Sequence, residues 1–237
     1  MARRVNFPCA ACSCAVLAFA LFAAPPALAE GSCRSDPAPG VDWSECLKAR
    51  RMMSGSDLTG ARLERADLSG SDLSGSKLAG ALLEGANLYR THLRDSDLSG
   101  ADLTKIEASR SVFSGADLSR SNLTKSELLR AEFVGARLIG SNFEKAELGR
   151  ANFSNADLTG ASLVGTNISR ADFRGAVVAD VRFEEAYTLR ALFHGVDLSV
   201  AAGLSQQQID WACGDENTTL PAGATRPATW PCAPDED

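Results

Sequence analysis

Arginine residues recur in this sequence at a spacing of twenty residues. The members of this Arg row are Arg90, Arg110, Arg130, Arg150, Arg170 and Arg190. A guanidinium group forms paired hydrogen bonds that suit carboxylates and phosphates. If twenty residues make one turn of the chain, the row is a candidate binding surface for an acidic partner. The alternative is a solvated charge ladder, partly neutralised by a neighbouring acidic column of Glu107, Glu127 and Glu147.

The other residues of the sequence do not form a recognisable catalytic motif. The chain has two histidines, His92 and His194, and it contains no nucleophile motif, phosphate loop or histidine metal pair. The abundant Ser and Asp residues belong to a repeat, in which Asp hydrogen-bonds the backbone near a bend. We therefore expect no enzymatic activity, no cofactor and no metal.

The element that must position the Arg row is a five-residue repeat running without insertion from residue 56 to 200. The unit is small, polar, large apolar and then two mostly polar residues, as in Ala66-Asp67-Leu68-Ser69-Gly70. Of its 29 units, 27 carry Leu, Phe, Ile or Val at the central position, and Ala108 and Thr188 are the exceptions. The units also loosen at 106–108 and 177–188, where bulges and partner sites both remain open interpretations.

A period of five fits neither a helix nor a plain strand, because a five-residue stripe would smear around a helix and change face along a strand. The conflict disappears if the chain turns a corner in every unit. The first and third residues then point inward, and the last position, often Gly, accommodates the corner with a positive φ. Four corners close a square coil of twenty residues, so residues 56–200 predict about seven coils.

These units resemble the pentapeptide-repeat family, whose unit is Ala-(Asp/Asn)-Leu-x-x. Residues 66–68, 86–88, 101–103 and 156–158 fit it fully. The resemblance implies an all-β solenoid, a right-handed quadrilateral β-helix. Coils stacked at ~4.8 Å would give a rod of roughly 35 Å.

Aligning the repeats at twenty residues also predicts the core. One inward column contains five of the repeat's phenylalanines, and a second column contains Phe143 and Phe183. The first column reads Leu73, Leu93, Phe113, Phe133, Phe153, Phe173 and Phe193. We interpret this stripe as core packing rather than a ligand groove.

The N-terminus has the pattern of an export signal. Arg3 and Arg4 precede an apolar run, and Ala27-Leu28-Ala29 is a small-x-small cleavage site. The run is too short to span a bilayer. We expect residues 1–29 to be a cleaved signal peptide and no stable membrane anchor to remain.

Cleavage would remove three cysteines and leave Cys33, Cys46, Cys213 and Cys232. A rod of the expected length would keep its ends too far apart for crossed pairs. The expected disulfides are therefore Cys33–Cys46 and Cys213–Cys232. A zinc site is the disfavoured rival, because no two of the four have ligand-pair spacing. Disulfides after a signal peptide indicate the periplasm or the extracellular space, and the bacterial assignment rests on the family resemblance.

Both ends of a solenoid need covers. We assign residues 30–55 to an N-terminal cap, with a short helix begun by Asp42 and Glu45 and with Trp43 shielding the first coil. We assign residues 201–237 to a C-terminal cap and tail, with a helix over 206–213. In that helix we expect a Ser205–Gln208 capping box, Trp211 near the last coil and Gly214 as the stop.

The favoured function is an exported, non-enzymatic scaffold or protein-interaction module. The family resemblance supplies an alternative, a DNA mimic that binds a type II topoisomerase. Such mimicry needs a dense acidic surface, yet residues 56–200 hold 20 acidic and 17 basic residues. Direct nucleic-acid binding is not expected, because the whole chain is negative. Dimerisation through an uncovered solenoid end remains open.

Overall fold

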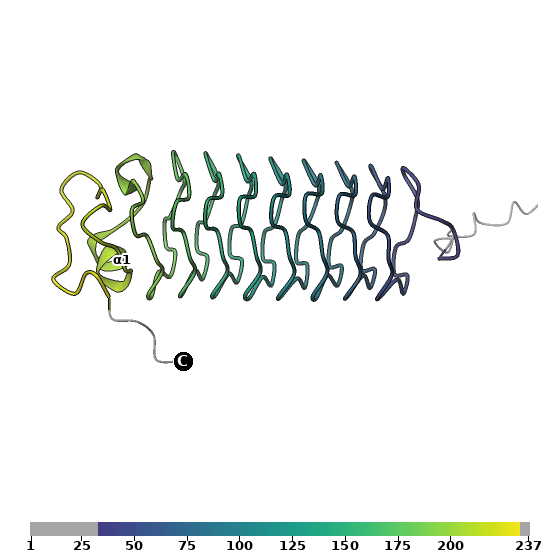
Figure 1. Cartoon of the computed structure of the whole chain (residues 1–237), viewed down its shortest axis with the longest axis horizontal. Helices are drawn as coiled ribbons and strands as arrows, with labels where there is room; N and C mark the ends of the chain where they lie inside the picture. The colour runs from purple at the N-terminus through teal and green to yellow at the C-terminus, as the bar shows by residue number, and fades with distance from the viewer. Residues whose placement is uncertain (1–32, 233–237) are drawn as a thin grey trace, which may run out of the picture. The chain divides into compact units, whose positions relative to one another are not determined.

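The computed structural model describes residues 33–232. The signal peptide expected at 1–29 and the acidic C-terminal residues lie outside them. The compact unit Gly31–Asp237 contains two helical elements within the described range. These are the 3-10 helix η1 (Leu198–Val200) and the α-helix α1 (Gln206–Trp211). Figure 1 shows the coils stacked one on another, from the purple N-terminal part to the yellow C-terminal part.

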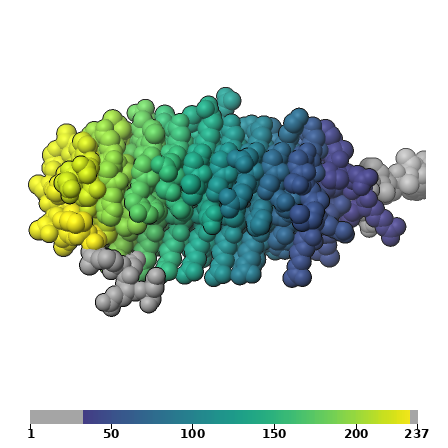
Figure 2. Space-filling view, viewed as in Figure 1, coloured from purple at the N-terminus to yellow at the C-terminus, as the bar shows by residue number. Residues whose placement is uncertain are grey.

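Coils are joined by single-residue parallel bridges rather than by long strands. All but the last two bridges join the second residue of a unit to the residue twenty positions later, as in Asp67↔Asn87 and Asp102↔Asn122. The twenty-residue coil is therefore confirmed. The space-filling view shows the successive coils as adjoining ridges (Figure 2).

Each unit turns its corner by the same local hydrogen bonds. The N–H of Ala66 donates to the Leu63 carbonyl oxygen at 3.0 Å, which closes the turn. The carboxylate of Asp67 accepts the N–H of Ser69 at 3.0 Å. The last residue of the unit has a positive φ, for example +64° at Gly70. This alternation of inward side chains and corners explains why the sequence has a period of five.

The core is a continuous column of apolar side chains inside the coils. Phe133 stacks between Phe113 and Phe153 with ring centroids 4.9 Å apart on both sides. Phe143 meets Phe153 edge-on at 6.1 Å from the second column. The predicted phenylalanine columns are confirmed, and all of these rings are fully buried.

The N-terminal end differs from the expected helix. The Asp42 carboxylate accepts the N–H of Ser44 at 3.0 Å, and Glu45 has a φ of +61°, so this unit turns a corner instead of starting a helix. Bridges of the regular spacing already start with Asp42↔Arg62. Coil geometry thus extends into residues 41–55 of the segment assigned to the N-terminal cap.

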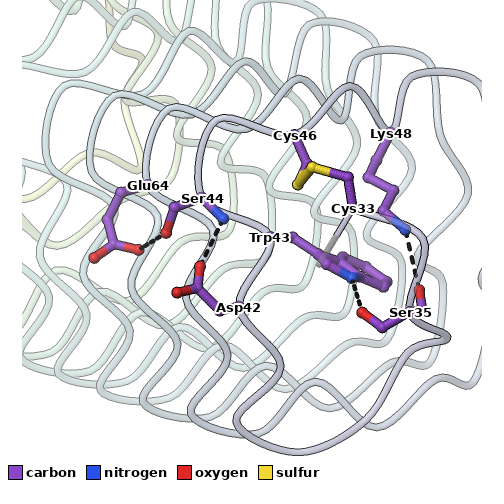
Figure 3. The surroundings of a disulfide bond; sticks show 8 residues. All are labelled: Cys33, Ser35, Asp42, Trp43, Ser44, Cys46, Lys48 and Glu64. Atoms are coloured by element: carbon purple, nitrogen blue, oxygen red, sulfur yellow. Dashed lines mark hydrogen bonds between the residues drawn. A yellow bond between two sulfur atoms is a disulfide. The ribbon is translucent and has the colours of Figure 1, made fainter. Parts of the chain in front are cut away.

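Trp43 is fully buried under the N-terminal segment, as expected for a residue that shields the first coil. Figure 3 shows its indole beside the Cys33–Cys46 disulfide and Ser35. The indole N–H donates to the Ser35 hydroxyl at 2.8 Å. The Lys48 ammonium lies 3.8 Å from the ring centroid, and burial lowers the pKa of this group.

The C-terminal helix confirms the predicted capping box: the Ser205 side chain accepts the Gln208 N–H, and the Gln208 side chain accepts the Ser205 N–H. The helix ends earlier than expected, with Ala212 as its C-cap. Both predicted disulfides are present, with Cα–Cα distances of 5.4 Å for Cys33–Cys46 and 5.5 Å for Cys213–Cys232.

At the C-terminal end Trp211 lies near the last coil, as expected: its ring centroid is 5.6 Å from that of Tyr187, and its carbonyl oxygen accepts the N–H of Arg190 at 2.7 Å. Trp211 is nevertheless 38% exposed, and the indole buried at this end belongs to Trp230, which is 9% exposed. The Trp230 N–H donates to the Ala212 carbonyl oxygen at 2.7 Å. Gly214 does not stop the helix through a positive φ; instead, a Cβ at this position would collide with the Trp230 ring.

Candidate functional site

The Arg row is in register along one corner of the coils. All six arginines occupy the last position of their units, with φ between +54° at Arg90 and +62° at Arg110. The backbone N–H of Arg110 donates to Leu129 of the next coil at 2.9 Å, and that of Arg130 donates to Gly149 at 2.9 Å. The side chains therefore leave the backbone from equivalent points, one per coil.

Arg50 belongs to the same corner and was missed by the sequence analysis. Its backbone N–H donates to the Ser69 carbonyl oxygen at 2.8 Å, the bond that Arg residues of the row make to their own next coil. Its φ is +56°. Between it and Arg90 the corner contains Gly70. Arg50 lies forty residues before Arg90, so the twenty-residue spacing could have identified it, but the recognisable repeat begins only at residue 56.

The middle of the Arg row is exposed and has no acidic partner. No ion pair between residues 33 and 232 includes Arg110, Arg130 or Arg150. Within residues 33–232, Glu107, Glu127 and Glu147 form no ion pair with these three arginines. Instead, the Glu147 carboxylate accepts the amide N–H of Asn167 at 2.9 Å.

Ion pairs form on other parts of the surface. Lys105 reaches Glu84 at 2.8 Å, and Arg65 pairs with Glu45. Lys105 begins the second basic corner, in which Lys105, Lys125 and Lys145 also have positive φ. The two basic corners are thus alike in backbone geometry, but the first Lys residue of this corner is neutralised locally.

Beside the Arg row lies a column of fourth-position residues that includes large exposed apolar side chains. Its members are Tyr89, Ser109, Leu129, Gly149, Ser169 and Leu189. Tyr89 is 39% exposed, Leu129 45% and Leu189 39%. We call this the apolar column. The Arg90 guanidinium lies 5.1 Å from the Tyr89 ring centroid, so charge and apolar surface adjoin.

A surface hollow of about 390 Å³ lies over the N-terminal end, and a second one of about 320 Å³ opens on the Arg corner. The second is lined by Leu129, Arg130, Gly149, Arg150, Asn167 and Ser169. Its lining combines two guanidinium groups with an apolar side chain and a glycine. This composition suits a ligand that carries both negative charge and an apolar group.

The structure does not assemble a catalytic site from the histidines. His92 and His194 belong to separate coils, and the bridge Asp72↔His92 places His92 near the N-terminal end. Among the described residues, no three His, Cys, Asp or Glu side chains gather into a potential metal site. Within residues 33–232, no helix is long and apolar enough to cross a membrane.

Residues of this chain match the family described as pentapeptide repeats, in eight copies. The matched ranges are 53–75, 71–107, 105–138 and 136–175. The comparison with curated proteins found no match.

Solved structures give further similarities. A trypsin-treated form of QnrB1, a plasmid-mediated fluoroquinolone resistance protein, is 20% identical with a TM-score of 0.60, covering 76% of this chain and 90% of that one. HetL, a protein involved in heterocyst differentiation regulation from the cyanobacterium Nostoc, is 22% identical with a TM-score of 0.31, covering 79% and 86%. A pentapeptide repeat protein of the Arabidopsis thaliana thylakoid lumen is 30% identical with a TM-score of 0.16, covering 51% and 70%. At these values only the QnrB1 likeness carries an argument, and it concerns the fold alone.

Proposed function

Because the chain belongs to the pentapeptide-repeat family, whose members form right-handed quadrilateral β-helices, we propose that it is a non-enzymatic interaction module. Its coils present the Arg row to an acidic protein partner. The observation that carries this proposal is the row itself: Arg110, Arg130 and Arg150 are exposed at successive coils and have no ion pair among the described residues.

The backbone at the Arg corner supports a role for these side chains. An L-residue with a positive φ costs about 1 kcal/mol or more relative to glycine. Another corner avoids this cost at most coils, for example at Gly55, Gly75, Gly115 and Gly135. At the Arg corner the cost recurs in coil after coil. The same cost recurs at Lys105, Lys125 and Lys145, so the capture experiment must compare the two corners.

We further propose that the module is exported from a bacterial cell. The expected signal peptide at 1–29 and the two disulfides favour an oxidising compartment, the periplasm or the extracellular space. In this proposal residues 56–200 form the repeat body of about seven coils, and the segments 30–55 and 201–237 cover its ends.

A homodimer through one solenoid end is also part of the proposal. Leu47 and Met52, at the N-terminal end, are each 80% exposed. At the other end, α1 and Trp230 cover the last coil. This asymmetry favours the N-terminal end for self-association.

The DNA-mimic alternative is the weaker proposal. A row of arginines along one corner opposes the dense negative surface that a DNA mimic needs. The fold likeness to QnrB1 at 20% identity does not transfer a function.

The test is affinity capture by the oxidised protein starting at Glu30, from periplasmic extract. The first variant reverses Arg110, Arg130 and Arg150 to Glu. The matched control reverses Lys105, Lys125 and Lys145, which have the same spacing and positive φ on another corner. We expect one acidic protein to be lost with the Arg variant and retained with the Lys variant, while thermal unfolding stays nearly unchanged. Equal capture by all three proteins would remove the Arg row as a site. Recovery of a topoisomerase from whole lysate would favour the alternative.

A further inference from the structure

The hollow on the Arg corner lies at a gap in the apolar column. Leu129 is followed by Gly149, then Ser169, and then Leu189. Two small residues thus separate two exposed leucines. Three coil steps of ~4.8 Å place the two leucine backbones ~14 Å apart, which is about the length of four extended residues.

The glycine in this gap is not required by the backbone. Gly149 is not among the residues with a positive φ, unlike the corner glycines. The preceding coil carries Leu129 at the same place in the unit, and Leu189 occupies it two coils later. A Cβ at position 149 would lie 3.1 Å from Leu129 Cδ2 and 3.5 Å from Ser169 Oγ. Without a side chain at 149, Leu129 Cδ2 lies close against the buried glycine, and the rest of the leucine side chain, which is 45% exposed, borders the hollow.

Charge surrounds the same hollow. Arg130 and Arg150 line it, both are exposed, and neither forms an ion pair among residues 33–232. The carboxylate of Glu147 is occupied by the amide of Asn167, which also lines the hollow. The surface thus offers two guanidinium groups around an apolar side chain.

We propose that this hollow anchors one apolar side chain of an extended acidic segment in a protein partner, a proposal that rests on the function proposed above. The acidic side chains of the segment bind Arg130 and Arg150, and its apolar side chain packs against Leu129 over Gly149. The site would therefore recognise a peptide segment that combines carboxylates with one apolar side chain.

The lining favours a peptide over a polyanion. Phosphate groups or sulfated sugars would use the guanidinium groups but would leave the exposed face of Leu129 without a partner. Enrichment of apolar anchors beside arginine is typical of protein interfaces.

The test uses two synthetic acidic heptapeptides of alternating Asp and Glu, one with Leu and one with Ser at the centre. Binding to the oxidised protein is measured by fluorescence anisotropy. Burying the leucine should make the Leu peptide bind about tenfold more tightly than the Ser peptide. Gly149→Leu fills the hollow without changing charge and should abolish this preference. Ser99→Leu, at the same unit position on another corner, should leave it intact.

The outcomes separate the hollow from the Arg row. Equal binding of both peptides by the unaltered protein would overturn the proposal that the hollow anchors an apolar side chain. A preference for the Leu peptide that survives Gly149→Leu would overturn it as well. The Arg row is tested separately, by the capture experiment. Lack of binding by either peptide overturns the hollow as well. If thermal unfolding shows that Gly149→Leu does not fold, Ser169→Leu fills the hollow from its other side and decides the question.

Discussion

The Thr188 hydroxyl donates a 2.7 Å hydrogen bond to the carbonyl oxygen of Gln208 in α1. Thr188 occupies one of the two central positions that lack Leu, Phe, Ile or Val, and its side chain is fully buried. The Gln208 amide in turn donates to the carbonyl oxygens of Phe183 and Ala186 at 2.8 and 2.9 Å. The irregular unit therefore attaches the terminal helix to the last coil.

Replacing Thr188 with Val should loosen this attachment. We expect the free energy of unfolding to fall by about 1 kcal/mol, because a buried hydrogen bond is lost. Amide exchange in α1 should accelerate more than exchange in the coils. Thr166→Val is the control, because the Thr166 hydroxyl bonds only the Leu163 carbonyl oxygen within its own turn. If amide exchange in α1 accelerated equally in the two variants, the attachment of α1 through Thr188 would be excluded.

Phe153 should be among the most costly core residues to truncate. Its ring is stacked on both sides, 4.9 Å from Phe133 and 5.0 Å from Phe173. Phe153→Ala should lower the free energy of unfolding by about 3–5 kcal/mol in urea titrations. Phe153→Leu should cost less, since Leu93 fills the same column nearer the N-terminus. A cost for Phe153→Leu as large as that for Phe153→Ala would contradict this expectation and would show that the stacked ring, rather than apolar volume, is what stabilises the column.

Gly214→Ala should destabilise the C-terminal end. A Cβ there meets the Trp230 ring, which must shift and strain its bond to Ala212. The expected loss is about 1–3 kcal/mol in thermal unfolding. Gly149→Ala is the matched control, because the one tight contact of its new Cβ would be with the flexible end of Leu129, at 3.1 Å. If both alanine variants unfold at the same temperature, the indole does not need Gly214.

Arg130→Gly should separate stability from binding. Arg130 has a φ of +57°, which glycine adopts without strain, so stability should rise by about 1 kcal/mol or stay unchanged. Arg130→Ala removes the same charge but keeps the strain, and it should be about 1 kcal/mol less stable than the glycine variant. Both should bind the acidic heptapeptides more weakly. Undiminished peptide binding by either variant would exclude Arg130 from the site.

Acid should weaken the turns. Hydrogen bonds from the Ser74 side chain and backbone lower the pKa of Asp72 below its ordinary value of 3.8. A carboxyl whose pKa is lower in the folded state stabilises the protein above its unfolded pKa, and this contribution is lost as the pH falls through the folded pKa. Asp57 behaves in the same way, through Thr59.

We therefore expect the urea midpoint to fall between about pH 5 and pH 2. Asp72→Asn keeps the accepting oxygen but cannot titrate, as at Asn87 in the next coil, where Oδ1 accepts the Tyr89 N–H. This variant should lose less stability over the same range. An identical acid response in the variant would assign the effect to other groups.

The period of the sequence predicted everything that depends on counting along the coils. The phenylalanine columns, the disulfide pairs and the order of the Arg row follow from twenty residues per coil. Predictions from the twenty-residue spacing were less accurate at the C-terminal end, where the spacing changes. Bridges lengthen to Leu192↔Cys213 and then Asp197↔Thr219, and the burial of Trp230 at this end was not predicted.

At the N-terminal end the difficulty was composition rather than spacing. Lys48 and Met53 occupy central positions that elsewhere carry Leu or Phe, so the units from residue 41 were not recognised. The sequence also could not predict which charged side chains pair with one another. A long side chain can reach several carboxylates, and in the folded chain the Glu147 carboxylate accepts a hydrogen bond from the Asn167 amide.

The twenty-residue coil also limits how such a gene can change in length. Duplicating or deleting one five-residue unit would keep the chain foldable as a coil. It would also move every later arginine by a quarter turn, onto a different corner. Only changes of twenty residues leave the Arg row, the apolar column and the phenylalanine stack in line. Length variants among descendants that use this surface should therefore differ by whole coils.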